Sequence, residues 1–100
     1  MAAFIISFRI GQSGNHAKRH ESVVQAIRGE ATDGATWEET PSFFVIQSAK
    51  TATALTDAIY YEAGLVADVD KLLVVNVSAQ TYAAKGNIAY PNTLDALMQP

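Results

Sequence analysis

Three basic side chains near the N-terminus are the residues best suited to contact a charged ligand. Arg9 lies near the end of the apolar run 3–10, and Lys18 and Arg19 follow further along the chain. Guanidinium and ammonium groups bind phosphate oxygens through charge-assisted hydrogen bonds. We therefore assign Arg9, Lys18 and Arg19 as candidate contacts to nucleic-acid phosphates. Arg9 has a structural alternative, as an interface salt bridge or a solvated guanidinium whose stem packs on the sheet.

Metal and nucleophile chemistry find little support in the sequence. His16 and His20 are four residues apart, a spacing that can place two imidazoles on one helix face. No third ligand is evident, whereas catalytic zinc needs three protein ligands and structural zinc four. The chain has no cysteine, which excludes disulfides and thiolate ligands. The sequence shows no serine–histidine–acid arrangement, so we assign no catalytic residue. We also assign no metal site and no cofactor.

The turn after the first apolar run contains the letters GQSG, residues 11–14. The same form occurs in a nucleotide-clamping loop of one RNA-binding module, but that loop joins two helices. Here the segment follows an expected strand and has no phosphate-loop lysine. We interpret it as an ordinary turn, since glycine and serine clusters are typical of turns.

The bulk composition describes one small globular domain. Of the 100 residues, 49% are hydrophobic and 17% charged, and the formal net charge is −3. A chain of this length buries a modest core, so self-association is a natural way to enlarge it. The acidic balance disfavours general nucleic-acid binding but allows a local basic patch. No secretion signal and no bilayer-length apolar run are visible, and the lack of cysteine fits the cytoplasm, where we expect the protein.

The periodicity of apolar residues predicts four strands and two helices. The expected strands are 3–10, 35–39, 42–48 and 71–78, and the expected helices are 16–28 and 52–63. Thr51 or Thr53 offers a cap for the second helix, and Gly64 ends it. This order predicts an α+β, ferredoxin-like βαββαβ sandwich, with two helices on one face of a four-stranded antiparallel sheet. We assign 1–80 to this domain and 81–100 to a tail, in which 87–90 is a candidate short fifth strand.

Alternation along the strands divides the side chains between two sheet faces. One set is wholly apolar and fits beneath the helices. The other set is half apolar, although an uncovered face should be mostly polar. An apolar patch of several hundred Å² exceeds what most monomers expose, so we predict a homodimer packed face to face. The predicted interface residues are Ile5, Ser7, Phe43, Val45, Leu72 and Val74.

Three segments resemble a known family. They are AFIISFRI at 3–10, TWEETPSFFVIQSAKTATALTDAI at 36–59 and DVDKLLVVNVS at 68–78. They are similar to strands and the second helix of the small CRISPR-associated adaptation-complex nucleases and their SinR-like and VapD-like relatives. The resemblance implies a ferredoxin-like fold and a face-to-face dimer. It also implies that a C-terminal strand crosses to the partner's sheet, a role that 87–90 could fill.

In the nuclease members, an acidic residue at the end of the first strand holds a divalent metal between two copies. The matching position here is Arg9, and a cation cannot ligate a hard metal ion. We therefore expect a small, homodimeric, non-catalytic relative that acts as a module for binding RNA or DNA, or for assembly. The alternatives are an active ribonuclease of the toxin type that uses other residues, and a dimer that senses a ligand or binds other proteins.

Overall fold

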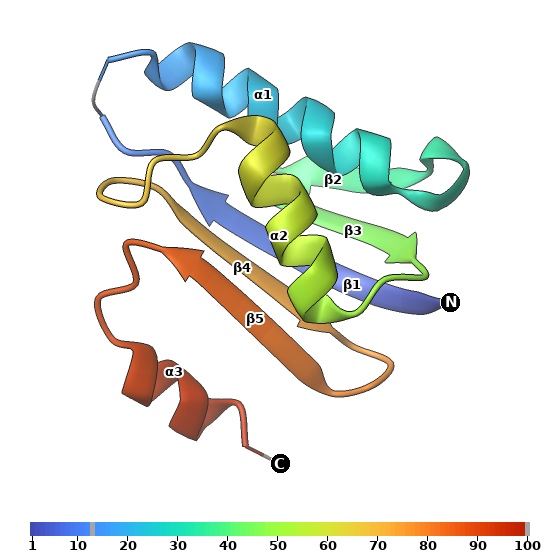
Figure 1. Cartoon of the computed structure of the whole chain (residues 1–100). Helices are drawn as coiled ribbons and strands as arrows, with labels where there is room; N and C mark the ends of the chain where they lie inside the picture. The colour runs from blue at the N-terminus through green and yellow to red at the C-terminus, as the bar shows by residue number, and fades with distance from the viewer. Residues whose placement is uncertain (13, 100) are drawn as a thin grey trace.

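The computed structural model describes residues 1–12 and 14–99, and Ser13 and Pro100 lie outside it. The described residues form one antiparallel sheet of five strands in the order β2-β3-β1-β4-β5 (Figure 1). The strands are β1 (Ala2–Arg9), β2 (Thr36–Thr40), β3 (Phe43–Ser48), β4 (Lys71–Asn76) and β5 (Thr81–Gly86). The predicted α+β class is confirmed, but the sheet has one strand more than the four expected.

Two long helices, α1 (His16–Glu30) and α2 (Ala52–Ala63), lie together on one face of the sheet (Figure 1). A short 3₁₀ turn, η1 (Thr32–Gly34), joins α1 to β2. The Thr51 hydroxyl caps α2 by accepting a hydrogen bond from the Ala54 amide at 3.1 Å. Gly64 ends α2 at a φ of 68°, a conformation that favours glycine. Both of these caps agree with the sequence prediction.

The core lies between these helices and the sheet. Alternate residues of β1 and β3 point into it, as predicted, and α1 and α2 each contribute an apolar stripe. The large apolar side chains that are fully or almost fully buried include Phe4, Ile6, Val23, Ile27, Phe44, Ile46, Leu55 and Ile59. β1 is the central strand of the five, and it pairs with β3 on one side and β4 on the other.

The alternation predicted for β4 is wrong by one residue. Leu72 and Val74 were expected on the uncovered face, but both are fully buried beneath the helices. The register places Leu72 opposite Phe8 and Val74 opposite Ile6, which point into the core. Asn76 is buried on the same side, and its side-chain oxygen accepts a hydrogen bond from the Ala79 amide at 2.9 Å. The turn after β4 therefore satisfies the polar side chain of Asn76, which had indicated that this side of the strand is exposed.

The C-terminal region forms more structure than the sequence predicted. β5 occupies 81–86 and pairs with β4 of the same chain. The strand expected at 87–90 is not present, because these residues link β5 to a short helix, α3 (Pro91–Leu97). α3 lies beyond the edge of the sheet (Figure 1). None of the helices formed by the described residues is both long and apolar enough to cross a bilayer.

Candidate functional site

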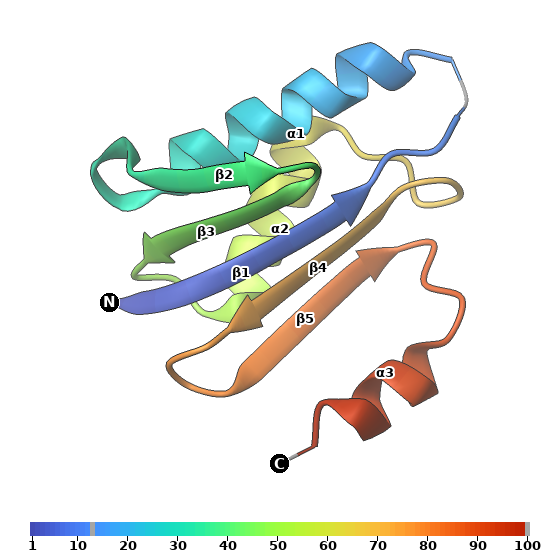
Figure 2. The same ribbon diagram turned by 180° about the vertical axis from the view of Figure 1, so that it is seen from behind.

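The sheet face opposite α1 and α2 is uncovered, as the reverse view shows (Figure 2). The register aligns Ile5 with Val45 on one side and with Val75 on the other. Trp37 of β2 contacts Phe43 edge to face, with ring centroids 6.2 Å apart. We call this surface the open face. Its large apolar side chains are Ile5, Trp37, Phe43, Val45, Leu73, Val75 and Val77, which are half-buried or exposed.

Four of the six predicted interface residues lie on the open face: Ile5, Ser7, Phe43 and Val45. Leu72 and Val74 do not, because they belong to the core. Leu73 and Val75 take their places, so the shift of one residue leaves the open face as apolar as the sequence predicted. Because the chain is described alone, the dimer stays a prediction.

Arg9 lies on the open face, where β1 ends, and its cross-strand neighbour is Lys71 of β4. Arg9 is exposed, and the half-buried Lys71 donates a hydrogen bond from its ammonium to the Asn87 carbonyl. Within the described part of the chain, neither cation is within ion-pair distance of a carboxylate. Like charges on directly opposed residues destabilise an antiparallel pair. This cation pair, Arg9 and Lys71, is therefore a place where a bound anion would be stabilising.

Arg19 is not available as a phosphate contact, which corrects the sequence prediction. Its side chain is buried, and its Nε donates to Asp70 Oδ2 at 3.1 Å. The same guanidinium donates to the carbonyl oxygens of Gly11, at 2.9 Å, and Gly14. We call these residues, together with Val66, the Arg19–Asp70 cluster.

Asp70 is fully buried at the centre of this cluster. Its carboxylate also accepts hydrogen bonds from the Gly11 amide at 2.8 Å and the Val66 amide at 2.7 Å. Burial alone raises the pKa of Asp70, but these two amides and the Arg19 guanidinium together hold that pKa below its ordinary value. The cluster joins the turn after β1 and the start of α1 to the loop before β4, so its role is structural.

The remaining candidates do not extend the cation pair. Lys18 is exposed on α1, which covers the opposite face of the sheet, so Lys18 and Arg9 lie on different faces of one chain. The His20 ring contacts Phe8 at a centroid distance of 5.5 Å, and His16 lies beside Gln12. The GQSG turn includes Ser13, which is outside the described residues. In the described chain, no three His, Asp or Glu side chains are grouped as a metal site requires.

Sequence reasoning missed Lys71 and Asp70 for different reasons. The wrong phase for β4 placed Lys71 on the helix-covered side, which concealed its pairing with Arg9. Asp70 lies far from Arg19 in the chain, so no local pattern connected them. A signal for the burial of Arg19 was present, since it is four residues before Val23 and eight before Ile27 on the apolar stripe of α1.

No protein-family model matches the chain, and neither a curated protein nor a solved structure matches it. The open face and the cation pair are therefore the features of the molecule that bear on its function.

Proposed function

We propose that the chain is a ferredoxin-like, homodimeric module of the nuclease-like type, which binds nucleic-acid phosphates without hydrolysing them. The order β2-β3-β1-β4 with α1 and α2 on one face supports the ferredoxin-like part, and β5 is an addition at one edge. The resemblance of β1 to the first strand of the nucleases supports the family. Arg9 supports the non-hydrolytic role, since it takes the position of the metal-ligating acid.

The apolar character of the open face is the observation that carries the dimer. Half-buried side chains such as Ile5, Val45 and Val75 form a continuous patch across three neighbouring strands. Monomers rarely leave such a patch in water. A second copy is the occupant with a matching apolar surface, and a two-fold axis lets the same patch serve both chains.

The cation pair supports phosphate binding at the margin of this interface. Arg9 and Lys71 lie side by side at one end of the open face, and each copy of a dimer brings one such pair. Arg can hold a phosphate through two parallel hydrogen bonds, and Lys adds a point charge. The net charge of −3 confines binding to this local patch.

Sedimentation equilibrium tests the dimer. We expect a two-chain mass at micromolar concentration for the natural chain and a single-chain mass for Ile5→Glu, because a carboxylate would be buried at the interface. Ala54→Glu places the same charge on the exposed side of α2 and should remain dimeric. A single-chain mass for the unaltered protein at these concentrations contradicts the proposal.

Fluorescence anisotropy with labelled single-stranded and duplex RNA and DNA tests phosphate binding. Arg9→Glu should weaken binding and lower the slope of affinity against salt, because fewer counterions are released. Lys18→Glu is the matched control, since it makes the same change of charge on α1. Absence of binding at low salt, or an equal loss in both variants, would overturn the nucleic-acid part. Incubation with labelled RNA and magnesium or manganese tests the ribonuclease alternative.

A further inference from the structure

The outer edge of β5 leaves backbone hydrogen-bonding groups without a partner strand. The Asn87 amide donates to the Asp70 carbonyl at 2.8 Å, and this bond fixes the phase of the β4–β5 pairing. Because bonding directions alternate along an antiparallel strand, Ala83 and Lys85 bond toward β4, whereas Tyr82 and Ala84 point outward. Within the described chain, no backbone group bonds to Tyr82 or Ala84 from the outer side.

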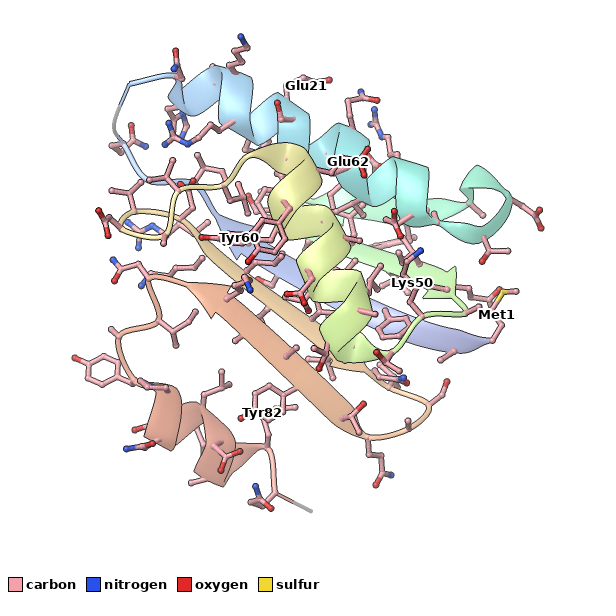
Figure 3. The ribbon with its side chains drawn as sticks, viewed as in Figure 1. Met1, Glu21, Lys50, Tyr60, Glu62 and Tyr82 are labelled. Carbon is pink, nitrogen blue, oxygen red and sulfur yellow. The ribbon has the colours of Figure 1, made fainter. Side chains whose placement is uncertain are left out.

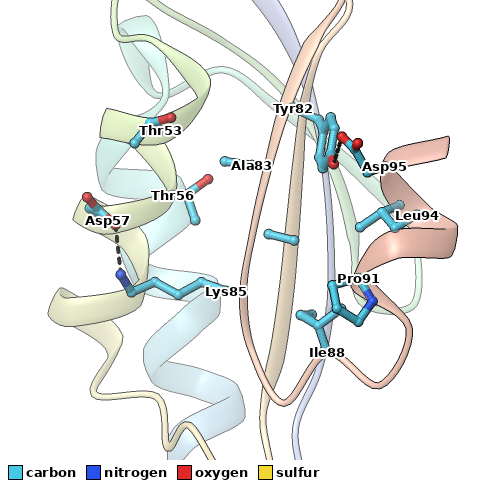
Figure 4. A pocket seen from close by; sticks show the side chains of 11 residues that line it. Thr53, Thr56, Asp57, Tyr82, Ala83, Lys85, Ile88, Pro91, Leu94 and Asp95 are labelled. Carbon is cyan, nitrogen blue, oxygen red and sulfur yellow. Dashed lines mark hydrogen bonds and ion pairs between the residues drawn. The ribbon is translucent and has the colours of Figure 1, made fainter. Parts of the chain in front are cut away.

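This edge forms the floor of a groove of about 640 Å³ (Figure 4). One wall is α2, which contributes Thr53 and Asp57, and the other is α3, which contributes Leu94 and Asp95. We call this feature the edge groove. Its volume lies in the range of ordinary ligand sites. Tyr82 lies between β5 and α3 (Figure 3), and its hydroxyl donates to Asp95 Oδ1 at 2.8 Å, which helps to fix the α3 wall.

Two common protections of an exposed strand edge, an outward-pointing lysine and an irregularity in the pairing, are missing from β5. A lysine can block an edge, but Lys85 turns toward α2, where its ammonium pairs with Asp57 at 3.1 Å and lies 4.9 Å from the centre of the Tyr61 ring. Ala83 and Ala84 are small, so they leave room for a neighbouring strand. The opposite edge differs, because β2 has a register irregularity between Trp37 and Thr40 that interrupts regular pairing.

The charges of the edge groove favour one kind of occupant. Asp57 and Lys85 compensate each other, whereas the exposed carboxylate of Asp95 accepts a hydrogen bond from a neutral hydroxyl and pairs with no cation among the described residues. The groove is therefore net acidic, which repels a nucleic acid and attracts a basic side chain. A residue paired with Ala84 or Tyr82 would point its side chain toward the α3 wall, where Asp95 lies.

We propose that the edge groove binds an extended segment of another protein as a sixth strand. The segment pairs through its backbone with Tyr82 and Ala84 and carries a lysine or arginine toward Asp95. It needs free N–H groups at the pairing positions, so it has no proline there. This site does not depend on the dimer or on the cation pair, since it lies along the β5 edge and uses no residue of either.

The test uses the full chain and a display library of random heptapeptides, from which enriched sequences are synthesised with a fluorescent label. We expect enriched peptides to be rich in β-branched residues, to carry a lysine or arginine and to lack central proline. In anisotropy measurements, Asp95→Lys should weaken their binding at least tenfold. Glu62→Lys, the same change on the exposed side of α2, should leave it unchanged. No enrichment, or an equal effect of both variants, overturns the proposal.

Two further measurements separate peptide pairing from other occupants. Replacing a central residue of the bound peptide with proline should abolish binding, because the pairing N–H is removed. In NMR hydrogen exchange, the Tyr82 and Ala84 amides should exchange quickly in the free protein and slowly with peptide, while Ala83 and Lys85 stay protected throughout. Unchanged exchange at Tyr82 and Ala84 on binding rules out pairing at this edge. If Ala84→Pro abolishes self-association, the occupant of the groove is a second copy of this chain. If a DNA oligonucleotide competes with the peptide, the occupant is a nucleic acid. Either result overturns the proposal.

Discussion

Two arginines at the same end of the sheet have opposite environments. Arg19 is buried against Asp70 and bonds to backbone carbonyls, whereas Arg9 is exposed beside another cation, Lys71. The two partners, Asp70 and Lys71, are neighbours in the chain but lie on opposite sides of the sheet. The comparison shows that the surroundings of an arginine, rather than its place in the sequence, decide whether its guanidinium is buried in an ion pair or left exposed.

Breaking the Arg19–Asp70 cluster should give the largest effect. Arg19→Met removes the guanidinium and leaves Asp70 as an unpaired buried charge, so the free energy of unfolding should fall by about 3–5 kcal/mol. Urea denaturation followed by circular dichroism measures this change. A loss below about 1 kcal/mol would contradict the structural role of the cluster. Arg9→Met makes the same replacement on the open face and should change stability far less.

Acid should also weaken the Arg19–Asp70 cluster, because protonation of Asp70 removes the negative partner of Arg19. The folded pKa of Asp70 is below its ordinary value of 3.8, so its contribution is present above that pH and is lost as the pH falls through the folded pKa. Urea titrations between pH 7 and pH 2.5 should show a loss of stability in the acidic part of that range. Asp70→Asn should lose less stability over that range than the natural chain. Equal acid sensitivity of the two proteins would show that Asp70 is not the source of the loss.

The backbone around Asp70 predicts a smaller but specific effect. A Cβ on Gly86 would lie 2.1 Å from the Asp70 carbonyl oxygen, and the φ of Gly86 is 104°. Gly86→Ala should therefore destabilise the fold by more than about 1 kcal/mol. Gly29 lies in α1 with open space around it, so Gly29→Ala should stabilise by about 0.5–1 kcal/mol. Thermal unfolding of both variants measures the two changes in stability. If both variants were stabilised, or both destabilised, the result would contradict this prediction.

The smallest stability effect is expected at the cation pair. Arg9→Ala removes an exposed side chain and the repulsion from Lys71, so unfolding should change by no more than about 0.5 kcal/mol, in the stabilising direction. Added phosphate should stabilise the natural chain more than this variant, because an anion offsets the repulsion. Differential scanning calorimetry with and without phosphate measures both the effect of the substitution on stability and the stabilisation by phosphate. If phosphate acts equally on both proteins, the cation pair does not bind it.

The sequence predicted elements well where polar and apolar residues alternate with a clear phase. β1 and β3 place Phe4, Ile6 and Phe44 in the core as expected, and Thr51 and Gly64 end α2 as their chemistry predicts. β4 failed because Asn76, the polar residue after its apolar run 72–75, indicated an exposed phase but is buried, whereas Ser7, Arg9 and Gln47 are exposed and indicate the phase of β1 and β3 correctly. Only pairing with β1 decides which side of β4 faces the helices, and that pairing is a tertiary contact.

The candidate site was predictable only in part for the same reason. Arg9 followed from the phase of β1, but its neighbour Lys71 depends on the β1–β4 register. Arg19 required knowledge that a distant aspartate would meet it in the interior. β5 was missed because TYAAKG has little β-branched character and pairs as a strand only when β4 lies beside it.

The central place of β1 has a consequence for synthesis in the cell. This strand is made before the other strands of the sheet, yet one of its two neighbours, β4, is translated several seconds later at typical elongation rates. Until then the apolar side chains of β1 lack half of their sheet and are open to wrong partners. A nascent chain stalled before residue 71 should therefore be held by chaperones and cut readily by protease, and one stalled well beyond residue 76 should resist digestion.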